Sequence, residues 1–433
     1  MNFFKTFFCI FISLSIHGLA TTDSTDSKLE LATATSQSTS TPESQVMLQA
    51  FDWESISNGK RGRHYDYLKT QINQWNQDGF NLVWLPPHMD SADSQGYAPG
   101  RWYLEINKNA LLSITSQMKS NNMTVLADMI FNHRTAPSKD ACTGKYTAFE
   151  GPYMGNWAVV SNDGGCNGND SPTCPDACGC GSKDTGENNC GFPDLDHTEI
   201  RVQNLIKEYL DYARSNLGIT GYRWDQSKGY RAEYAKMYND HGQASFAVAE
   251  IYDGSLERVK KWIQASNSTI PVFDFPLYFI LKRSVRSNNY VELMGVPSVL
   301  AWNSGLAVTF TANHDTQRSG SFGLNDEQNV QGYVYILTHP GVPCVFWTDY
   351  QSTKYQAIIK SLVALRKTVQ VHANSPFTVV EAKAGIYAAY VTGIKGKLAV
   401  LLGNVSWTPS STSNSSNSFK LEASGSNYKV WSI

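Results

Sequence analysis

Three carboxylates stand close behind short apolar segments of the sequence. Asp225 follows GYRW, Glu250 follows FAVA, and Asp315 follows AVTFTAN after one histidine. A carboxylate in such a place can simply cap a turn, but three that converge on one site can carry out chemistry. Cleavage of a glycosidic bond needs a proton donor and a second carboxylate that attacks or guides water, on opposite sides of the bond. Glycoside hydrolysis is therefore the leading hypothesis.

The segments around these carboxylates alternate between strand and helix patterns. Short β-branched or aromatic runs predict strands at residues 45–51, 81–87, 124–130, 221–225, 245–252, 272–277, 307–313 and 342–348. Amphipathic stretches between and after them, such as 197–217 and 354–370, predict helices. This alternation predicts an α/β fold, a closed (β/α)8 or TIM barrel formed by residues 45–133 and 197–370. The active site of such a barrel lies at the C-terminal ends of its strands, where we expect the three carboxylates to meet.

Two regions depart from the barrel pattern. Residues 371–433 alternate apolar and polar positions and predict a C-terminal antiparallel β-sheet domain. Residues 134–196, after the third strand, form a cysteine-rich insertion that contains Cys142, Cys166, Cys174, Cys178, Cys180 and Cys190. In an oxidising compartment these six predict three disulfides among themselves, with a zinc cluster as the alternative. Cys344 stands alone in an apolar strand and is expected to be a buried free thiol.

The N-terminal residues indicate export. Residues 1–20 combine Lys5, an apolar stretch at 7–16, and small residues at Gly18 and Ala20, a pattern typical of a secretory signal peptide. Residues 21–44 are rich in Ser and Thr and predict a disordered linker. We therefore expect a protein that is secreted, extracellular or within a digestive or lysosomal compartment. Sequons that fit glycosylation occur at Asn122, Asn169, Asn267, Asn404 and Asn414.

Composition narrows the class of partner. The formal net charge of −2 over 433 residues argues against nucleic acid and against an anionic membrane after signal cleavage, because neither attracts a near-neutral surface. Aromatic residues reach 12%, which suits a protein that stacks rings on sugars, although most rings in any protein belong to the core. We expect a monomer.

Five segments resemble the ordered signature segments of the α-amylase family of glycoside hydrolases. They are LADMIFNH (126–133), FPDLDH (192–197), GITGYRWDQSKGY (218–230), FAVAEIY (246–252) and FTANHD (310–315), and the text around them is most similar to plant-type α-amylases. The resemblance runs from about residue 45 to the last residue, apart from the cysteine-rich insertion. It implies an enzyme that cuts internal α-1,4 bonds of starch, glycogen or related α-glucans with retention of configuration.

The resemblance also implies a role for each matching residue. Asp225 would be the nucleophile, Glu250 the acid and then the base, and Asp315 the residue that holds sugar hydroxyls. Arg223 stands two residues before Asp225, so it points the same way in a strand and can pair with the nucleophile. The alternative for Arg223 is a salt bridge inside the barrel. The other side chains expected to contact substrate are Tyr97, His133, Lys228 and His314.

A calcium site is implied as well. Asn132, Asp184 and Asn188 would supply side-chain oxygens, and Glu187 and Gly229 would supply backbone carbonyls, which matches the preference of Ca²⁺ for oxygen ligands. Position 188 is usually Asp in the family, so Asn188 removes one negative charge and predicts weaker binding than in a plant-type relative. The alternative is a polar loop held by hydrogen bonds alone.

Several positions depart from the family. Trp224, Gln226 and Ser227 replace Phe, Phe and Ala of plant-type members, and Ala312 replaces an acidic residue. Where some plant enzymes carry two adjacent tryptophans as a granule-binding site, this chain has Trp302 followed by Asn303.

Three other functions remain alternatives. They are a related exo-acting amylase, a catalytically dead carbohydrate-binding protein on the same scaffold, and a secreted disulfide-rich interaction protein. The presence of all three carboxylates favours an enzyme over a catalytically dead binding protein. The five segments favour an enzyme over a disulfide-rich interaction protein.

Overall fold

The computed structural model describes residues 44–162, 176–187, 191–318, 320–410 and 418–433. The expected signal peptide and all but the last residue of the expected linker lie outside these residues, as do Cys166, Cys174, Cys190 and Asn188. Within the described part of the chain, no helix combines the length and the apolar character needed to span a bilayer.

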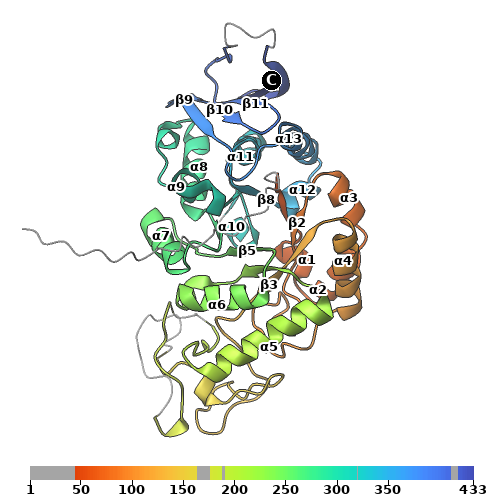
Figure 1. Cartoon of the computed structure of the whole chain (residues 1–433), viewed down its shortest axis with the longest axis vertical. Coiled ribbons are helices and arrows are strands. Elements are labelled where there is room, and N and C mark those ends of the chain that lie inside the picture. The colour runs from red at the N-terminus through yellow and green to blue at the C-terminus, as the bar shows by residue number, and fades with distance from the viewer. Residues whose placement is uncertain (1–43, 163–175, 188–190, 319, 411–417) are drawn as a thin grey trace, which may run out of the picture. The chain divides into compact units, whose positions relative to one another are not determined.

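Eight parallel strands close into a barrel, so that each strand pairs with two neighbours (Figure 1). The strands are β1 (Met47–Gln49), β2 (Leu82–Trp84), β3 (Thr124–Met129), β4 (Gly221–Trp224), β5 (Phe246–Ala249), β6 (Val272–Phe273), β7 (Ala307–Phe310) and β8 (Val342–Phe346). Each lies within one of the eight predicted segments, so the barrel prediction is confirmed. The barrel closes where Met47 of β1 pairs with Cys344 of β8, and Cys344 is buried and free, as predicted.

Helices follow most of the strands. The α-helices of the described residues are α1 (Trp53–Ile56), α2 (Arg61–Leu68), α3 (Ile72–Gln77), α4 (Lys108–Ser120), α5 (Ile200–Leu217), α6 (Ala232–Gly242), α7 (Leu256–Ala265), α8 (Phe275–Ser287), α9 (Val299–Asn303), α10 (His314–Arg318), α11 (Asp326–Thr338), α12 (Trp347–Gln351) and α13 (Gln356–Val369). Single 3-10 turns are η1 (Asn156–Ala158), η3 (Asp176–Cys178), η4 (Ser227–Gly229), η5 (Val291–Met294) and η6 (Ser304–Leu306). α5 buries Val202, Ile206, Tyr209 and Ala213 on one face, the spacing of an amphipathic helix.

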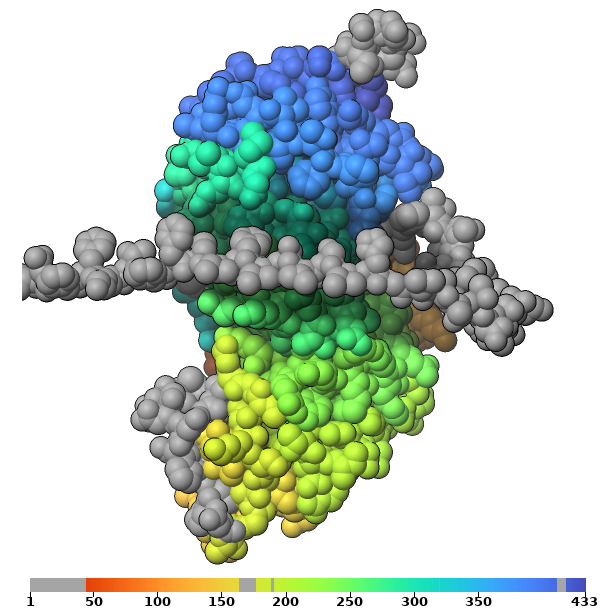
Figure 2. Space-filling view, turned by 60° about the vertical axis from the view of Figure 1, so that its left-hand side comes forward, coloured from red at the N-terminus to blue at the C-terminus, as the bar shows by residue number. Residues whose placement is uncertain are grey.

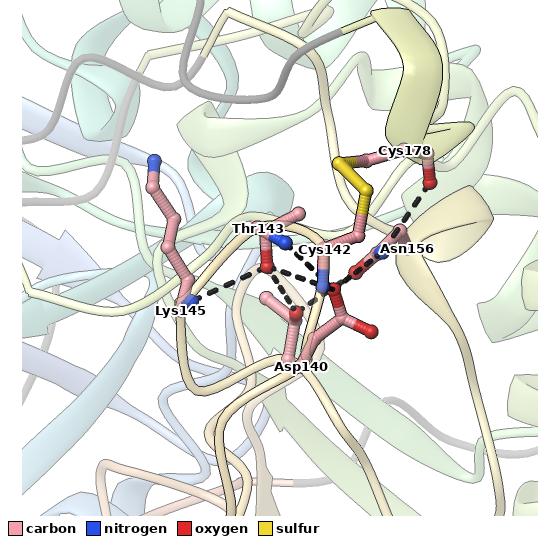
Figure 3. The surroundings of a disulfide bond; sticks show 7 residues. Asp140, Cys142, Thr143, Lys145, Asn156 and Cys178 are labelled. Atoms are coloured by element: carbon pink, nitrogen blue, oxygen red, sulfur yellow. Dashed lines mark hydrogen bonds between the residues drawn. A yellow bond between two sulfur atoms is a disulfide. The ribbon is translucent and has the colours of Figure 1, made fainter.

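The cysteine-rich insertion is held by a disulfide and by hydrogen bonds to one carboxylate. Cys142 is bonded to Cys178, and Cys180 is also disulfide-bonded. Oδ1 of Asp140 accepts the backbone N–H of Cys142 and an amide N–H of Asn156, each at 2.9 Å (Figure 3). Asn156 also donates to the carbonyl of Cys178 at 3.3 Å, so this network reaches both ends of the disulfide. The prediction of disulfides within the insertion is confirmed for this pair.

The C-terminal residues form a five-stranded antiparallel sheet in the order β12-β13-β11-β10-β9. Its strands are β9 (Phe377–Lys383), β10 (Ile386–Thr392), β11 (Lys397–Leu402), β12 (Lys420–Gly425) and β13 (Tyr428–Ser432). In β10, Tyr387 and Ala389 join the large core, whereas Ile386 and Ala388 join a small apolar cluster on the other face. Nε2 of His339, just after α11, lies 2.8 Å from the hydroxyl of Tyr387. In Figure 2 the blue C-terminal residues accordingly lie directly against the cyan and green residues that precede them in the chain.

Candidate active site

Two of the three predicted catalytic carboxylates stand next to each other at the end of the barrel. Asp225 directly follows β4, and Glu250 directly follows β5, which is the neighbouring strand. Trp224 and Ala249 pair across these strands, so the residues after them lie at the same level. The backbone N–H of Glu250 donates to the carbonyl of Trp224 at 3.0 Å and continues the pairing to this point.

Asp315 reaches the site from a short helix. We expected it to close the seventh strand, but β7 ends well before it, and Asp315 lies in the first turn of α10. The reason is local, because Oδ1 of Asn313 accepts the N–H groups of Asp315 at 3.0 Å and Thr316 at 2.8 Å and starts a helical turn. Asp315 nevertheless lines the same cleft as the other two carboxylates.

The guanidinium of Arg223 joins the carboxylates beneath the cleft. Arg223 is fully buried, and its Nη1 lies 2.8 Å from Oδ1 of Asp128. The same nitrogen contacts Asp225, and Nη2 lies 2.8 Å from Oε1 of Glu250. The two interpretations of Arg223, a partner of Asp225 and a salt bridge inside the barrel, therefore describe one set of contacts. Its planar array of donors can hold several carboxylates at fixed positions.

Three carboxylates around one guanidinium leave an excess of negative charge. Burial raises the pKa of Asp225 well above its usual value, against the opposing charge of Arg223. The carboxylates of Glu250 and Asp128 raise the pKa of Asp225 further. Burial also raises the pKa of Asp128, again against Arg223. In both groups burial outweighs the charge of Arg223, which acts to keep the carboxyl groups ionised.

A cleft with a volume of about 410 Å³ opens above these groups. The structure brings to it all the predicted catalytic and substrate-contacting side chains except the buried Arg223, namely Asp225, Glu250, Asp315, Tyr97, His133, Lys228 and His314. Residues that the sequence did not single out as substrate contacts also line it, namely Trp53, Asp93, Phe192, Gln226, Tyr252 and Arg318. The aromatic rings in this wall offer faces on which sugar rings can stack.

His314 is held in one protonation state. Its Nδ1 lies 3.0 Å from the amide Nε2 of Gln49, which donates to it, so the ring proton resides on Nε2. Nε2 lies 3.4 Å from Oδ2 of Asp315. Burial lowers the pKa of His314 well below its usual value, and the charge of Arg223 lowers it further. A neutral His314 thus presents an N–H donor beside Asp315.

Tyr97 and His133 support each other. Nε2 of His133 donates to the backbone carbonyl of Tyr97 at 2.8 Å, and the Tyr97 hydroxyl donates to Oδ2 of Asp128 at 2.7 Å. The Tyr97 ring stacks on His314, with centroids 5.2 Å apart and planes 11° apart. These contacts fix the Tyr97 ring in the cleft wall. They also occupy the Nε2 donor of His133, a side chain that we expected to contact the substrate.

The turn after Asp225 joins the cleft to the insertion. Gln226 has a left-handed backbone, with φ 40° and ψ 48°, and its N–H donates to Oε2 of Glu250 at 3.1 Å. Nζ of Lys228 lies 2.6 Å from Oε2 of Glu187, and the Lys228 carbonyl accepts the N–H of Glu187 at 3.0 Å. The ammonium that we expected to contact substrate is therefore also an ion-pair partner at the cleft rim.

Asp128 is a site residue that was not singled out from the sequence. It is fully buried in β3 and accepts hydrogen bonds from Arg223, from Tyr97, and from Nε1 of Trp84 at 3.0 Å. The sequence does contain an indication of this role, because Asp128 is the one charged residue in the apolar run TVLADMI. A buried carboxylate needs a charged or hydrogen-bonding partner, so an acidic residue in such a strand points to a polar site.

The predicted calcium ligands meet where the insertion contacts the turn after Asp225. Asn132 is fully buried; its Nδ2 donates to Asp194 at 2.8 Å, whereas its Oδ1 has no hydrogen-bond partner within the described ranges. That oxygen faces Gly229, since a Cβ on Gly229 would lie 1.9 Å from it. A Cβ on Gly186 would lie 2.5 Å from the Gly229 carbonyl oxygen. The site therefore offers a buried amide oxygen that lacks a hydrogen-bond partner and, beside it, a backbone carbonyl that two glycines leave accessible. Both are the kind of oxygen ligand that a calcium ion takes.

The charge of this ligand set is low. Among the described residues no group of three or more His, Cys, Asp or Glu side chains is placed to hold a metal. The predicted set relies instead on amide and carbonyl oxygens together with Asp184, which lies in the segment that contacts the turn. Oδ1 of Asp184 accepts the N–H of Thr185 at 2.6 Å. The remaining predicted ligand, Asn188, lies outside the described residues.

Two family models match the chain. Residues 64–375 match the alpha amylase catalytic domain, and residues 368–432 match the alpha-amylase C-terminal beta-sheet domain. The chain is 31% identical over 419 residues to the probable alpha-amylase 2 of Arabidopsis thaliana, which covers 89% of this chain and 94% of that protein. It is 27% identical to a glucan 1,4-alpha-maltotetraohydrolase of Roseateles saccharophilus, over 89% of this chain and 73% of that protein.

The fold resembles solved structures as well. An α-amylase from Anoxybacillus superposes with a TM-score of 0.67 at 14% identity, and the match covers 90% of this chain and 97% of that one. At this level of identity the likeness concerns the fold.

Proposed function

The chain belongs to the α-amylase family and is a glycoside hydrolase of the α-amylase type, and we propose that it cuts internal α-1,4-glucosidic bonds of starch, glycogen or related α-glucans with retention of configuration. The observation that carries this proposal is the placement of Asp225 and Glu250 on the two terminal nitrogens of one buried guanidinium, at the floor of a cleft. Two carboxylates held so close together suit the retaining mechanism, in which one attacks the sugar directly.

In the first step, an oxygen of Asp225 attacks the anomeric carbon while Glu250 gives its proton to the leaving glycosidic oxygen. The bond to the leaving glucan breaks, and a covalent glycosyl-enzyme forms on Asp225. In the second step, Glu250 takes a proton from water, and the water oxygen displaces Asp225 from the same carbon. Two inversions give net retention, and both carboxyl groups return to their starting protonation states.

Arg223 and Asp128 are positioning residues in this scheme. Arg223 keeps Asp225 in place and favours its ionised form, which is the nucleophilic form. Asp128 anchors the other side of the guanidinium and holds the hydroxyl of Tyr97. Asp315 and the N–H of His314 would bind hydroxyls of the sugar at the point of cleavage, and Trp53 and Tyr97 would offer it ring faces, since all four residues line the cleft.

We propose that a calcium ion stabilises this site. Asn132, Asp184, Asn188 and the carbonyls of Glu187 and Gly229 would hold it. When bound, the ion would link oxygen ligands from the insertion to oxygen ligands from the barrel. The chain itself already joins these parts through the Lys228–Glu187 ion pair. Because Lys228 lies three residues after Asp225, this junction also supports the wall of the cleft.

The setting that we propose is extracellular. It rests on the signal-like residues 1–20 and on the Cys142–Cys178 disulfide, which suits an oxidising compartment. The proposed partner is the α-glucan substrate, and the proposed state is a monomer.

One digestion tests the proposal. Long-chain amylose is treated with the enzyme, early products are separated by chromatography, and the anomer of fresh product is followed by NMR. We expect a spread of oligosaccharide lengths and initial α-anomer. A single product such as maltotetraose from the start would favour the exo-acting alternative, for which the similarity to a maltotetraohydrolase is the supporting observation. Initial β-anomer would exclude retention, and binding without turnover would favour the carbohydrate-binding protein.

A further inference from the structure

A second pocket adjoins the helix that carries Asp315. It has a volume of about 260 Å³ and shares no lining residue with the cleft. α10 contributes to both, since Asp315 lines the cleft, whereas Thr316 and Gln317 line the second pocket. The other walls come from the residues just after β7, from α8, from the segment after α10, from α11, and from the end of β8 with α12.

The lining combines rings with hydrogen-bonding groups. Tyr278 and Phe346 are each only 2% exposed, so these two rings bring apolar surface to a largely enclosed space. The amide groups of Gln317 and Asn329 and the hydroxyl of Thr348 supply donors and acceptors. Most of the surface that lines the pocket is polar, and convergent hydrogen-bonding groups beside a few rings suit a small polar ligand.

Among the described residues, Asp349 is the only charged one that lines this pocket. Its Oδ2 accepts the hydroxyl of Tyr333 at 2.6 Å, which fixes the direction of the carboxylate. Each carboxylate oxygen can accept two hydrogen bonds, so Asp349 retains capacity for ligand hydroxyls. One carboxylate among neutral groups suits a neutral ligand with several hydroxyl donors, and its charge would repel an anion.

The polar groups are held in place before any ligand arrives. Nδ2 of Asn329 donates to the hydroxyl of Tyr355 at 3.0 Å, and its Oδ1 accepts the N–H of Gly323 at 2.7 Å. The hydroxyl of Thr348 donates to Oδ2 of Asp52 at 2.7 Å. Such preorganisation lowers the entropy lost on binding.

We propose that this pocket binds a single pyranose, such as free glucose, independently of the cleft. The volume lies just below the ~300–1,000 Å³ of sites for drug-sized ligands, which limits the occupant to about one sugar ring. Hydroxyls around the ring would meet Asp349, Asn329 and Gln317, and the C–H faces would meet the aromatic rings. The inference rests on the proposed function only in that its test fills the cleft with a maltooligosaccharide, whose binding is checked first, and glucose binding itself is measured without turnover.

The test measures glucose binding while the cleft is occupied. A Glu250→Gln enzyme is saturated with maltoheptaose, glucose is titrated, and saturation-transfer NMR reports bound glucose. Ala312→Leu adds bulk to the pocket wall, and Ala301→Leu, on the exposed side of α9, is the matched control. Asp349→Asn keeps the shape of the side chain but removes the charge.

We expect the glucose signal to persist with the cleft filled, to vanish in Ala312→Leu and to remain in Ala301→Leu. Asp349→Asn should weaken glucose binding by about tenfold, as expected when a hydrogen bond to a charged group is lost. Loss of the signal once maltoheptaose fills the cleft would overturn the proposal, as would binding of Na⁺ or Ca²⁺ but not glucose. If Ala312→Leu does not fold, an unchanged affinity in a folded Asp349→Asn enzyme would overturn it as well. Failure of the amylose digestion would leave this result unaffected.

Discussion

The backbone N–H of Gln226 donates a hydrogen bond of 3.1 Å to Oε2 of Glu250. It can do so because Gln226 adopts a left-handed backbone directly after Asp225. That conformation costs a residue with a Cβ roughly 1–2 kcal/mol, so the surrounding contacts must hold it. The proposed acid is thus oriented by the main chain of Gln226 beside the proposed nucleophile.

Replacing Gln226 separates the role of its backbone from that of its side chain. Gln226→Gly adopts the left-handed conformation without strain, so we expect kcat to stay within about threefold of the original enzyme. Gln226→Val opposes that conformation, because a β-branched side chain is crowded there, and should lower kcat about tenfold. Steady-state kinetics on a soluble maltooligosaccharide give both values. Equal kcat for the two variants would mean that the N–H bond does not orient Glu250.

Asp225 has a structural counterpart that serves as its control. Asp274 directly follows β6 and is fully buried, but its oxygens accept the N–H groups of Leu277, Val299 and Leu300 at 3.0, 3.2 and 2.7 Å. Asp225→Asn should lower kcat by several orders of magnitude in a folded protein, because the covalent step is lost. Asp274→Asn should instead lower the free energy of unfolding by about 1–3 kcal/mol, with kcat little changed.

Kinetics and denaturant unfolding of both variants distinguish these effects. Turnover near the original value in Asp225→Asn would remove the nucleophile assignment. A large loss of kcat in folded Asp274→Asn would show that a carboxylate which caps α8 and α9 also takes part in the chemistry.

The acid side of the pH profile should depend on Asp128. The nucleophile acts in its ionised form, so activity is lost as pH falls through the pKa of Asp225. Burial raises the pKa of Asp225, and the charge of Asp128 is one of the factors that raise it further. Asp128→Asn removes that charge, so the acid limb of kcat/KM should move to lower pH. The pH profile of Asp274→Asn, measured in parallel, should not move. A shift of the Asp128→Asn limb to higher pH would contradict this account.

Calcium removal should weaken the contact between insertion and barrel. Because the ion would bind only the folded junction, chelation should lower both Tm and activity, and added Ca²⁺ should restore them. Gly229→Ala should weaken calcium binding, since a Cβ there would lie 1.9 Å from Oδ1 of Asn132. Gly295→Ala, where a Cβ meets nothing within 4 Å, is the matched control. Asn188→Asp should tighten binding by adding ligand charge.

A calorimetric titration with Ca²⁺ after exhaustive chelation shows whether the calcium site exists. If no heat of calcium binding is found and melting is unchanged, the polar-loop alternative holds for Asn132, Asp184 and their neighbours.

The sequence predicted the barrel because its signals are local and repeated. Each strand is a short apolar run, and the carboxylates after β4 and β5 follow directly from where those runs end. We expected Asp315 to close the seventh strand, but Asn313 accepts the N–H groups of Asp315 and Thr316 and starts a helical turn, which an apolar pattern does not reveal. Asp128 was missed because its partners, Arg223 and Tyr97, lie far from it in the sequence. Only the closed barrel brings these groups together.

The pairing of Cys344 with Met47 has a consequence for how the molecule assembles. These residues are about three hundred positions apart, so the barrel cannot close until nearly all of its strands have been synthesised. Asp225 and Glu250 therefore leave the ribosome long before their site exists. Burial raises the pKa of the Cys344 thiol, so it should be inert in the native chain and reactive before closure. A thiol-specific label applied during refolding would then time the closing of the barrel through a residue that takes no part in catalysis.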